Sequence, residues 1–365
     1  MSEWQTFYLK DLGKIVGGAT PSTNNPKNYG NKIAWITPKD LSTLQGRYIK
    51  KGSHSISRLG FKSCSCVLLP KHAILFSSRA PIGYVAIAKK RLCTNQGFKS
   101  IIPNKKIYFE FLYYLLKYHK DNISNIGGGT TFKEVSGATL GLFKVKIPPT
   151  YYEQQKIART LSILDQKIEN NHKINELLHT LAYKIYEYYF KYRPKNAKLE
   201  QIIIENPKSS IMVKNAQKTQ DKYPFFTSGD NILSYPKAII DGRNCFLNTG
   251  GNAGIKFYVG KASYSTDTWC ICANEFSDYL YLLLSSIKTH INQSFFQGTS
   301  LKHLQKNLLK KYPIYMPSAH EIKKFNQIIM PLLTLISINT RISKKLEQIR
   351  DFLLPLLLKQ QVKPQ

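Results

Sequence analysis

The sequence predicts an α+β fold in which one architectural unit occurs twice, each copy a globular α/β domain followed by a long helix. Three observations predict it: an internal repeat, matched helix-start signals after each repeat, and a heptad pattern in both of the segments that follow. We expect globular domains at residues 1–149 and 194–317, and helical spacers at residues 150–193 and 318–365.

The repeat is clearest in a short glycine-led motif. Residues 129–135 match residues 298–304, an offset of 169 from Gly129 to Gly298, and residues 111–115 match residues 279–283. Downstream, residues 143–147 and 312–316 alternate like half-buried strands, and each strand is followed by proline. Two copies of one domain are therefore expected.

Each predicted strand is followed by the same helix-start signal. Thr150 with Glu153, and Ser318 with Glu321, have the spacing of a capping box, in which hydroxyl and carboxylate bond to free backbone amides of the first turn. A long helix is therefore expected to begin at the equivalent place in each half. Roughly 40 residues of helix span about 60 Å, enough to separate two domains.

Both long helices carry a heptad seam. In the first helix it consists of Ile157, Leu161, Leu164, Ile168, Asn171, Asn175, Leu178, Ala182, Ile185 and Tyr189. Adding 168 gives Phe325, Ile329, Leu332, Ile336, Asn339, Ser343, Leu346, Arg350, Leu353 and Leu357. A shared polar step in the seam is typical of helices held in one register. We expect the helices to pack as an antiparallel coiled coil that relates the halves by a pseudo-two-fold axis. The alternative is that each helix lies on its own domain. Pro331 and Pro355 are expected to bend or shorten the second helix.

The charge of the chain points to a polyanionic partner. Lys and Arg number 53 against 22 Asp and Glu, a formal charge of +31, which nucleic acid would neutralise. The alternative is that the positive charge only reflects an organism whose proteins are basic in general. The first residues show no secretory signal, and the apolar run 352–358 is short and interrupted by proline, so we expect a cytoplasmic protein.

The sequence shows no motif for catalysis or for metal binding. The cysteine pairs at 64/66 and 270/272 lack metal-ligand spacing, so free buried thiols and no metal site are expected. No loop suits an amino-methyltransferase, the triple glycine 127–129 is not followed by a Walker lysine, and acidic residues are sparse for a two-metal nuclease. A self-sufficient enzyme is therefore disfavoured.

Polar turns after strands are the candidate DNA contacts, because such side chains can reach base edges and phosphates. The candidates are Lys39, Ser77, Ser78, Arg79, Asn95, Gln96, Thr227, Ser228, Asn248 and Asn252. The alternative is that Ser77, Ser78 and Asn95 hydrogen-bond their own turns.

The sequence resembles the specificity subunit of type I restriction–modification systems. Residues 35–41, 75–83, 93–98, 147–149 and 153–158 and the heptad helix after them carry the resemblance, which spans nearly the whole chain. It implies two target-recognition domains that read the halves of a bipartite, asymmetric DNA site. The second half departs from the pattern at residues 248–252 and at Asp267, where the first half has Gln96, so the domains are expected to read different sequences.

The resemblance also implies partners. Two methyltransferase subunits would dock around the helices and flip the target adenine, and two restriction/translocase subunits would join for cleavage. S-adenosylmethionine, ATP and magnesium are expected on those subunits, with no cofactor and no catalysis in this chain. The alternative is a stand-alone coiled-coil nucleic-acid-binding or scaffold protein with little sequence specificity. Divergent turns beside closely similar helices favour the first hypothesis.

Overall fold

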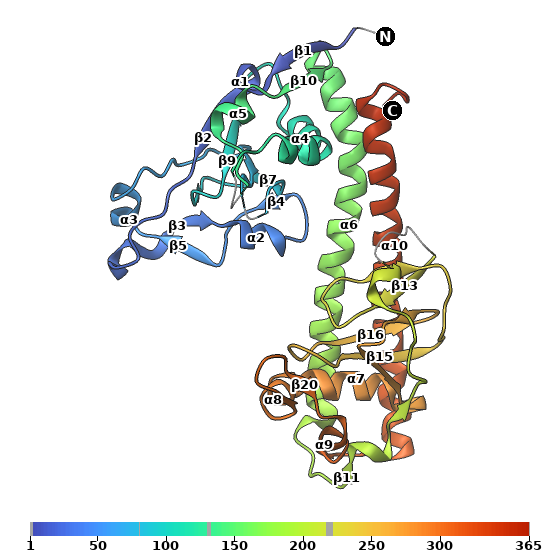
Figure 1. The fold of residues 1–365 in the computed structure, drawn as a ribbon. Coiled ribbons are helices and arrows are strands. Elements are labelled where there is room, and N and C mark those ends of the chain that lie inside the picture. Colours follow the sequence, from blue (N-terminus) through green and yellow to red (C-terminus); the bar gives the residue numbers. More distant parts are fainter. Residues whose placement is uncertain (1–2, 80, 130–132, 217–221, 365) are drawn as a thin grey trace. The chain divides into compact units, whose positions relative to one another are not determined.

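The computed structural model describes residues 3–79, 81–129, 133–216 and 222–364. By its internal contacts the chain divides into unit 1, Met1–Glu169 with Lys345–Gln365, and unit 2, Asn170–Lys344. Each unit holds one globular domain and a part of each long helix, α6 (Tyr151–Tyr186) and α10 (Ala319–Leu358) (Figure 1).

The domain of unit 1 is mainly β-structure with one longer helix. Its strands are β1 (Gln5–Tyr8), β2 (Gly13–Gly17), β3 (Tyr29–Ile36), β4 (Tyr48–Ile49), β5 (His54–Ile56), β6 (Ile74–Phe76), β7 (Val85–Ala88), β8 (Cys93–Thr94), β9 (Lys99–Pro103) and β10 (Lys144–Ile147). Its helices are α1 (Leu9–Leu12), α2 (Pro38–Ser42), α3 (Arg58–Lys62), α4 (Phe109–Asn125) and α5 (Gly137–Gly141).

The domain of unit 2 follows the same plan. Its strands are β11 (Ala197–Lys198), β12 (Ile204–Glu205), β13 (Tyr223–Phe226), β14 (Leu233–Tyr235), β15 (Arg243–Asn248), β16 (Ile255–Val259), β17 (Ser263–Tyr264), β18 (Thr268–Cys272), β19 (Phe296–Gln297), β20 (His303–Leu304) and β21 (Pro313–Ile314). Its helices are α7 (Ser277–Ser286), α8 (Lys288–Ser294) and α9 (Lys306–Lys310).

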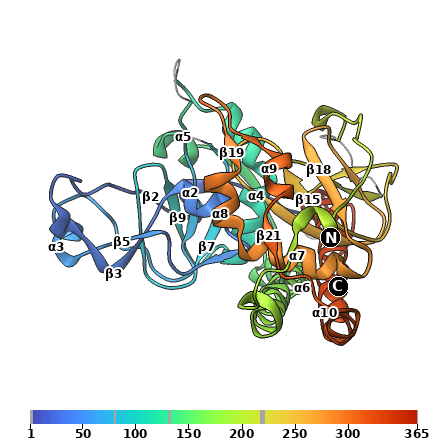
Figure 2. The same cartoon turned by 90° about the horizontal axis from the view of Figure 1, so that it is seen from below.

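Sheet topology confirms the repeat. The order β2-β9-β6-β7 in unit 1 matches β12-β18-β15-β16 in unit 2, and β4 adds an edge strand in unit 1. In the three-stranded sheets, β3 pairs antiparallel with β5 and parallel with β8, just as β13 pairs with β14 and β17. Figures 1 and 2 show that β3, β5 and α3 form the part of the first domain farthest from α6. The chain therefore contains two α/β domains of one topology in tandem.

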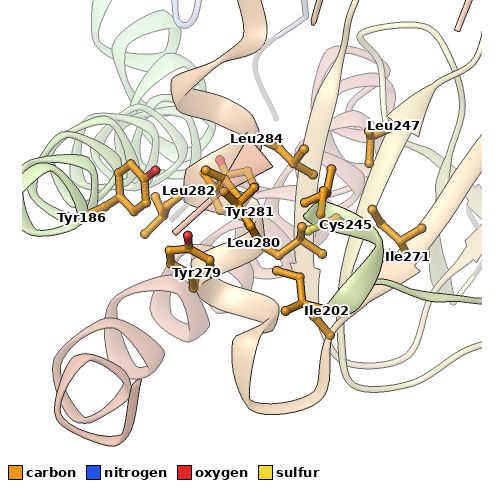
Figure 3. Close-up of a cluster of buried hydrophobic side chains, with 14 of the residues drawn as sticks. Tyr186, Ile202, Cys245, Leu247, Ile271, Tyr279, Leu280, Tyr281, Leu282 and Leu284 are labelled. Atoms are coloured by element: carbon orange, nitrogen blue, oxygen red, sulfur yellow. The ribbon is translucent and has the colours of Figure 1, made fainter. Parts of the chain in front are cut away.

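A domain helix fills each core. In unit 2, α7 is buried on all sides, as expected for a helix with apolar residues around its circumference. Leu280 and Leu284 pack with Cys245 and Ile271 of the sheet, while Tyr279 contacts Tyr186 of α6 (Figure 3). In unit 1, α4 takes the same place against β6 and β7. Each such large side chain contributes roughly 1.5–3 kcal/mol by leaving water.

The capping box predicted at Ser318 is confirmed, and Thr150 and Glu153 pair at the start of the first long helix. The backbone N of Glu153 donates to the Thr150 hydroxyl at 3.2 Å, and that hydroxyl contacts the Glu153 carboxylate at 3.0 Å. In the second half, the backbone N of Ser318 donates to the Glu321 carboxylate at 2.9 Å, and the backbone N of Glu321 donates to the Ser318 hydroxyl at 3.4 Å. The long helices therefore begin where the repeat predicts.

Prolines do not shorten the second helix, so that part of the expectation is wrong. α10 spans 40 residues and continues through Pro331 and Pro355. Ile329 and Leu333 on either side of Pro331 are buried in the core of unit 2, and tertiary packing of this kind holds a helix together across a missing backbone bond. No helix in the described part of the chain is long and apolar enough to cross a membrane.

Glycine explains why the repeat motif begins as it does. Gly129 and Gly298 have φ angles of 117° and 140°, a region that glycine adopts freely and other residues rarely do. A Cβ atom at Gly298 would lie 2.4 Å from the Leu301 carbonyl oxygen. The rest of the first motif, residues 130–132, and residue 80 lie outside the described residues.

Candidate nucleic-acid interface

Three turns meet at one sheet edge of the first domain. Because β3 and β8 are parallel, with Trp35 opposite Cys93, their carboxyl ends lie at the same edge. The backbone N of Asn95 donates to the Ile36 carbonyl at 2.9 Å, and that of Ser78 donates to the Gly97 carbonyl at 2.8 Å. The turns containing Lys39, Ser77–Arg79 and Asn95–Gln96 are therefore brought together.

The two serines of this cluster are buried. Ser77 is fully buried, and its hydroxyl donates to the Pro81 carbonyl and accepts from the backbone N of Tyr84, both at 2.8 Å. Ser78 is also fully buried, and its backbone carbonyl accepts from Val135. Neither hydroxyl faces solvent, so the structure corrects their assignment as DNA contacts. The Ser77 hydroxyl holds its own turn, whereas the Ser78 hydroxyl has no hydrogen-bond partner among the described residues.

Other predicted residues of the first domain do face solvent. Lys39 and Gln96 are exposed, and Gln96 contacts the hydroxyl of Thr20. Arg79 is partly exposed and lies 3.8 Å from the Glu134 carboxylate. Asn95 is half-buried, and its side-chain oxygen accepts from the backbone N of Gly97 at 3.0 Å. Its amide nitrogen therefore remains as the group that can donate to a base.

An equivalent edge exists in the second domain. The backbone N of Ser265 donates to the Phe226 carbonyl at 2.9 Å, and that of Thr249 donates to the Asp267 carbonyl at 3.3 Å. The ends of β13, β15 and β17 are thereby joined, as those of β3, β6 and β8 are in the first domain. Shared topology thus places both sets of predicted contacts at matching edges.

Two predicted residues of this edge are buried. Asn248 is 6% exposed, donates to the Asn252 carbonyl at 3.1 Å and accepts from the Lys256 ammonium at 3.1 Å. Thr227 is also 6% exposed and accepts from the backbone N of Gly229 at 3.0 Å. Both side chains hold their own turns, so the structure corrects their assignment as direct contacts.

The remaining candidates of the second domain are Ser228 and Asn252. Asn252 is exposed at the tip of the turn. Ser228 is half-buried, and its hydroxyl contacts the Asp267 carbonyl and accepts from Thr249 at 3.1 Å. Asp267 and Thr266 are exposed beside them. Sequence reasoning aligned Asp267 with Gln96 but did not select it.

Gly18 is a further residue of the first edge that the sequence reasoning missed. A Cβ atom there would lie 2.1 Å from the Asn95 carbonyl oxygen and 2.3 Å from that of Thr94. The next residue, Ala19, donates its backbone N to the Thr94 carbonyl at 3.0 Å. Glycine therefore lets this segment run against the Asn95 turn. The adjacent pair Gly17-Gly18 was the available signal.

The residues predicted to form the helix seams are all buried or half-buried. Ile157, Leu161, Ile168, Phe325, Ile329, Ile336 and Asn339 are buried, and Leu164, Asn171, Leu178, Leu332 and Leu346 are half-buried. In unit 2, Asn171 donates to the Ser343 hydroxyl at 3.1 Å and Asn339 donates to the Asn175 side-chain oxygen at 3.0 Å. In unit 1, Arg350 pairs with Asp165 at 2.7 Å. Within unit 2, partners run in opposite directions along the two helices, so they are antiparallel there.

A second apolar stripe on the helices faces solvent. On α10 it consists of Ile328, Leu335, Ile342 and Ile349, each seven residues after the last and 39–46% exposed. On α6 it includes Ile174, Leu177, Leu181 and Tyr188. Their spacing continues a heptad in a second register. Sequence reasoning assigned one seam to each helix and passed over this one.

The fold and the site define a class of protein with two domains of one topology that differ in the side chains of their exposed turns, and with two long helices that are antiparallel within unit 2. The family model described as type I restriction modification DNA specificity domain matches residues 1–180 and 195–348. The chain belongs to this family of type I specificity subunits.

Relatives agree with that assignment. The chain is 33% identical to the type I restriction enzyme MjaIX specificity subunit of Methanocaldococcus jannaschii, over 97% of this chain and 92% of that one. It is 30% identical to the HindI specificity subunit of Haemophilus influenzae, over 46% of this chain and 37% of the other. A crystal structure of the S subunit from M. genitalium superposes with a TM-score of 0.62 at 18% identity, covering 98% and 96% of the two chains, which shows the shared fold.

Proposed function

We propose that this chain is the DNA-recognition subunit of a type I restriction–modification complex and binds a bipartite, asymmetric site, one half through each domain. The observation that carries the proposal is the pair of matching sheet edges with different side chains. Arg79 and Gln96 project at the first, and Asn252 and Asp267 at the second. Two domains that share a backbone fold but present different hydrogen-bond donors and acceptors are suited to recognise different base sequences.

Charge supports binding to DNA before any base is read. A formal charge of +31 supplies attraction to phosphates that is independent of sequence and sensitive to salt. Base contacts from the exposed turns would then select the site. Arg79 and Lys39 suit guanine or phosphate, whereas the amides of Asn95, Gln96 and Asn252 suit adenine.

Partner subunits would carry the chemistry. The exposed stripe Ile328, Leu335, Ile342 and Ile349 is suited to bind apolar faces of partner helices, because exposed residues at heptad spacing bury best against another helix. We infer that two methyltransferase subunits dock on the helices, bring S-adenosylmethionine and flip the target adenine. Two restriction/translocase subunits using ATP and magnesium would join for cleavage, in the cytoplasm.

Methylome sequencing with and without the gene tests this function. Deleting the gene should remove methylation from one bipartite adenine motif and leave all other methylated motifs unchanged. Re-expressing the chain should restore that motif, and a strain lacking only the partner methyltransferase is the matched control. A methylome that is identical with and without the gene would contradict the proposal.

A further inference from the structure

A polar cavity of about 280 Å³ lies in the second domain beside its exposed turn. Strand β12 and the residues after it form one wall, and β18 with its preceding loop forms another. Thr249 of the turn, Thr266 and Thr268 also line it; the Thr249 hydroxyl donates to the Asp267 carbonyl at 2.7 Å, and the Thr268 hydroxyl donates to the Phe226 carbonyl at 3.3 Å. The cavity therefore opens at the same sheet edge as Asn252 and Asp267.

Positive charge exceeds negative charge around this cavity. Lys208 and Lys306 line it, and Glu205 is the carboxylate among its lining residues. Both Glu205 oxygens are already engaged, one by the Lys310 ammonium and the other by the Trp269 indole N–H at 2.7 Å. Among the described residues, no carboxylate lies within ion-pair distance of Lys208 or Lys306.

Lys306 is held in place although it lacks an acidic partner. Its ammonium lies 5.2 Å from the centre of the Trp269 ring, which attracts a cation through its face. Burial lowers the pKa of Lys306, Lys310 and Lys208 lower it further, and Glu205 opposes them. A bound anion would relieve both the burial of the charge and the repulsion between the lysines.

The first domain lacks these groups. Helices α5 and α9 begin at equivalent positions, where Gly137 stands in place of Lys306. At the repeat offset of 171 that aligns Gln96 with Asp267, Phe98 stands in place of Trp269. The cation and the indole that fixes Glu205 are therefore particular to the second domain.

We propose that this cavity binds a phosphate group, and that in the complex this is one backbone phosphate of the DNA beside the second half-site. Lys306 and Lys208 would neutralise the phosphate and donate charge-assisted hydrogen bonds to its oxygens, and the hydroxyl of the exposed Thr266 would donate a further one. A fixed phosphate contact next to Asn252 would set the register of the second domain on DNA without reading a base. The inference rests on the proposed function only in that the chain binds DNA.

Salt dependence of DNA binding tests the proposal on duplexes of any sequence. Each neutralised phosphate contributes about 0.9 to the slope of log K against log salt concentration, so Lys306→Gln should lower the slope by about that amount. Affinity should fall by roughly tenfold, equally for unrelated duplexes. Lys208→Gln, at an exposed residue whose loss cannot disturb the core, should act in the same direction.

Lys261→Gln is the matched control, since it removes one exposed lysine from the same domain away from the cavity. It should change the slope by less than either variant. An unchanged slope in both Lys306→Gln and Lys208→Gln, or a changed preference between duplex sequences in place of a uniform loss, would overturn the inference. The second result would mean that the cavity reads a base.

Two further experiments test whether the bound phosphate belongs to DNA or to a free compound, and distinguish failure of this inference from failure of the proposed function. On the site found by methylome sequencing, one methylphosphonate linkage should weaken binding to the unaltered chain and have no added effect with Lys306→Gln. Calorimetric titration with inorganic phosphate and deoxyadenosine monophosphate in place of DNA should give no saturable binding. Tight binding there would make a free phosphate compound the ligand and overturn the DNA assignment. Loss of the slope without any sequence preference would instead count against the proposed function alone.

Discussion

Arg47 and Glu169 are joined twice. The backbone N of Arg47 donates to Oε1 of Glu169 at 2.9 Å, and the guanidinium Nε donates to the same oxygen at 3.1 Å. Glu110 lies 3.0 Å from this guanidinium and Asp165 lies 4.0 Å from it. The side chains of Arg47, Glu110 and Asp165 are almost fully shielded from solvent. Arg47 belongs to the first domain and Glu169 to α6, so a buried cation fixes the domain to its helix within unit 1.

Replacing Arg47 should destabilise unit 1 strongly. Arg47→Ala removes the cation from Glu110 and Glu169, while Asp165 keeps Arg350, and breaking a buried ion pair from one side costs about 3–5 kcal/mol. The change is read by urea unfolding in a Trp269→Phe background, where Trp4 and Trp35 of unit 1 are the remaining tryptophans. Arg47→Lys, which keeps the charge but not the fork of donors, should lose less. Equal stability of the Ala variant and the parent would contradict the account.

Half of this arrangement follows from the repeat offset in the sequence. Glu110 and Asp278 stand 168 residues apart at the second position of α4 and α7, and the repeat offset predicts that they are equivalent. Their cations are not equivalent: Arg47 precedes β4, whereas Arg243, which pairs with Asp278, begins β15. Pairings between distant segments depend on the packed fold, so a repeat in the sequence does not reveal them.

The same limit applies to the exposed turns. Strand order, capping boxes and helix seams follow from periodicity and local hydrogen bonding, so the sequence predicts them well. Whether Ser77 or Gln96 faces solvent depends on which hydroxyl or amide the turn itself uses, and that is decided by backbone geometry. The small polar side chains of the turns were therefore selected together from sequence, although the structure divides them. Ser77, Ser78, Thr227 and Asn248 are buried, Asn95 and Ser228 are half-buried, and Asn252 is exposed.

Asp40 should make the stability of the first domain depend on pH. Burial opposes its ionisation, but hydrogen bonds from the backbone N–H groups of Ser53 and Thr37 outweigh burial and lower its pKa below the ordinary 3.8. A lowered pKa in the folded state adds stability above the unfolded pKa, and that stability is lost as pH falls through the folded value.

Asp40→Asn should accordingly lower the free energy of unfolding by about 1 kcal/mol at pH 7, because hydrogen bonds to a charged acceptor are lost. The difference between variant and parent should shrink as pH falls below 4. Urea unfolding at a series of pH values, with the exposed Asp121→Asn as control, measures it. A difference that stays constant with pH would show that the charge of Asp40 does not stabilise the fold.

Substitutions of Asn175 and Asn339, which are hydrogen-bonded between the two helices, should have coupled effects on stability. Asn339 is 8% exposed and donates to Asn175, so Asn175→Leu alone leaves a buried amide unpaired at a cost of about 1–3 kcal/mol. Asn175→Leu with Asn339→Leu should recover that loss or exceed the parent in stability, since apolar seam residues stabilise helix pairs. Thermal unfolding in a Trp4→Phe, Trp35→Phe background, followed by Trp269 fluorescence, reports unit 2. Strictly additive effects of the two substitutions would argue against the contact.

Helix length should set the spacing between the two halves of the DNA site. One heptad inserted after Glu169 and one after Lys344 preserves both seams and adds about 10.5 Å of helix, roughly three base pairs of B-DNA. Methylome sequencing should then show the same half-sites with a longer spacer. A heptad in α6 alone breaks the match between the helices and should abolish methylation. If the spacer between the half-sites is unchanged in the variant with both insertions, the helices do not set its length.

Exchange of one domain tests the central claim most directly, that each domain reads its own half of the site. Residues 1–149 are replaced by the equivalent domain of another specificity subunit, and the methylated motif of the hybrid complex is sequenced. The account predicts that one half-site changes to that of the donor, while the other half-site and the spacer stay the same. A motif that is unchanged, or one in which both halves change, would contradict it.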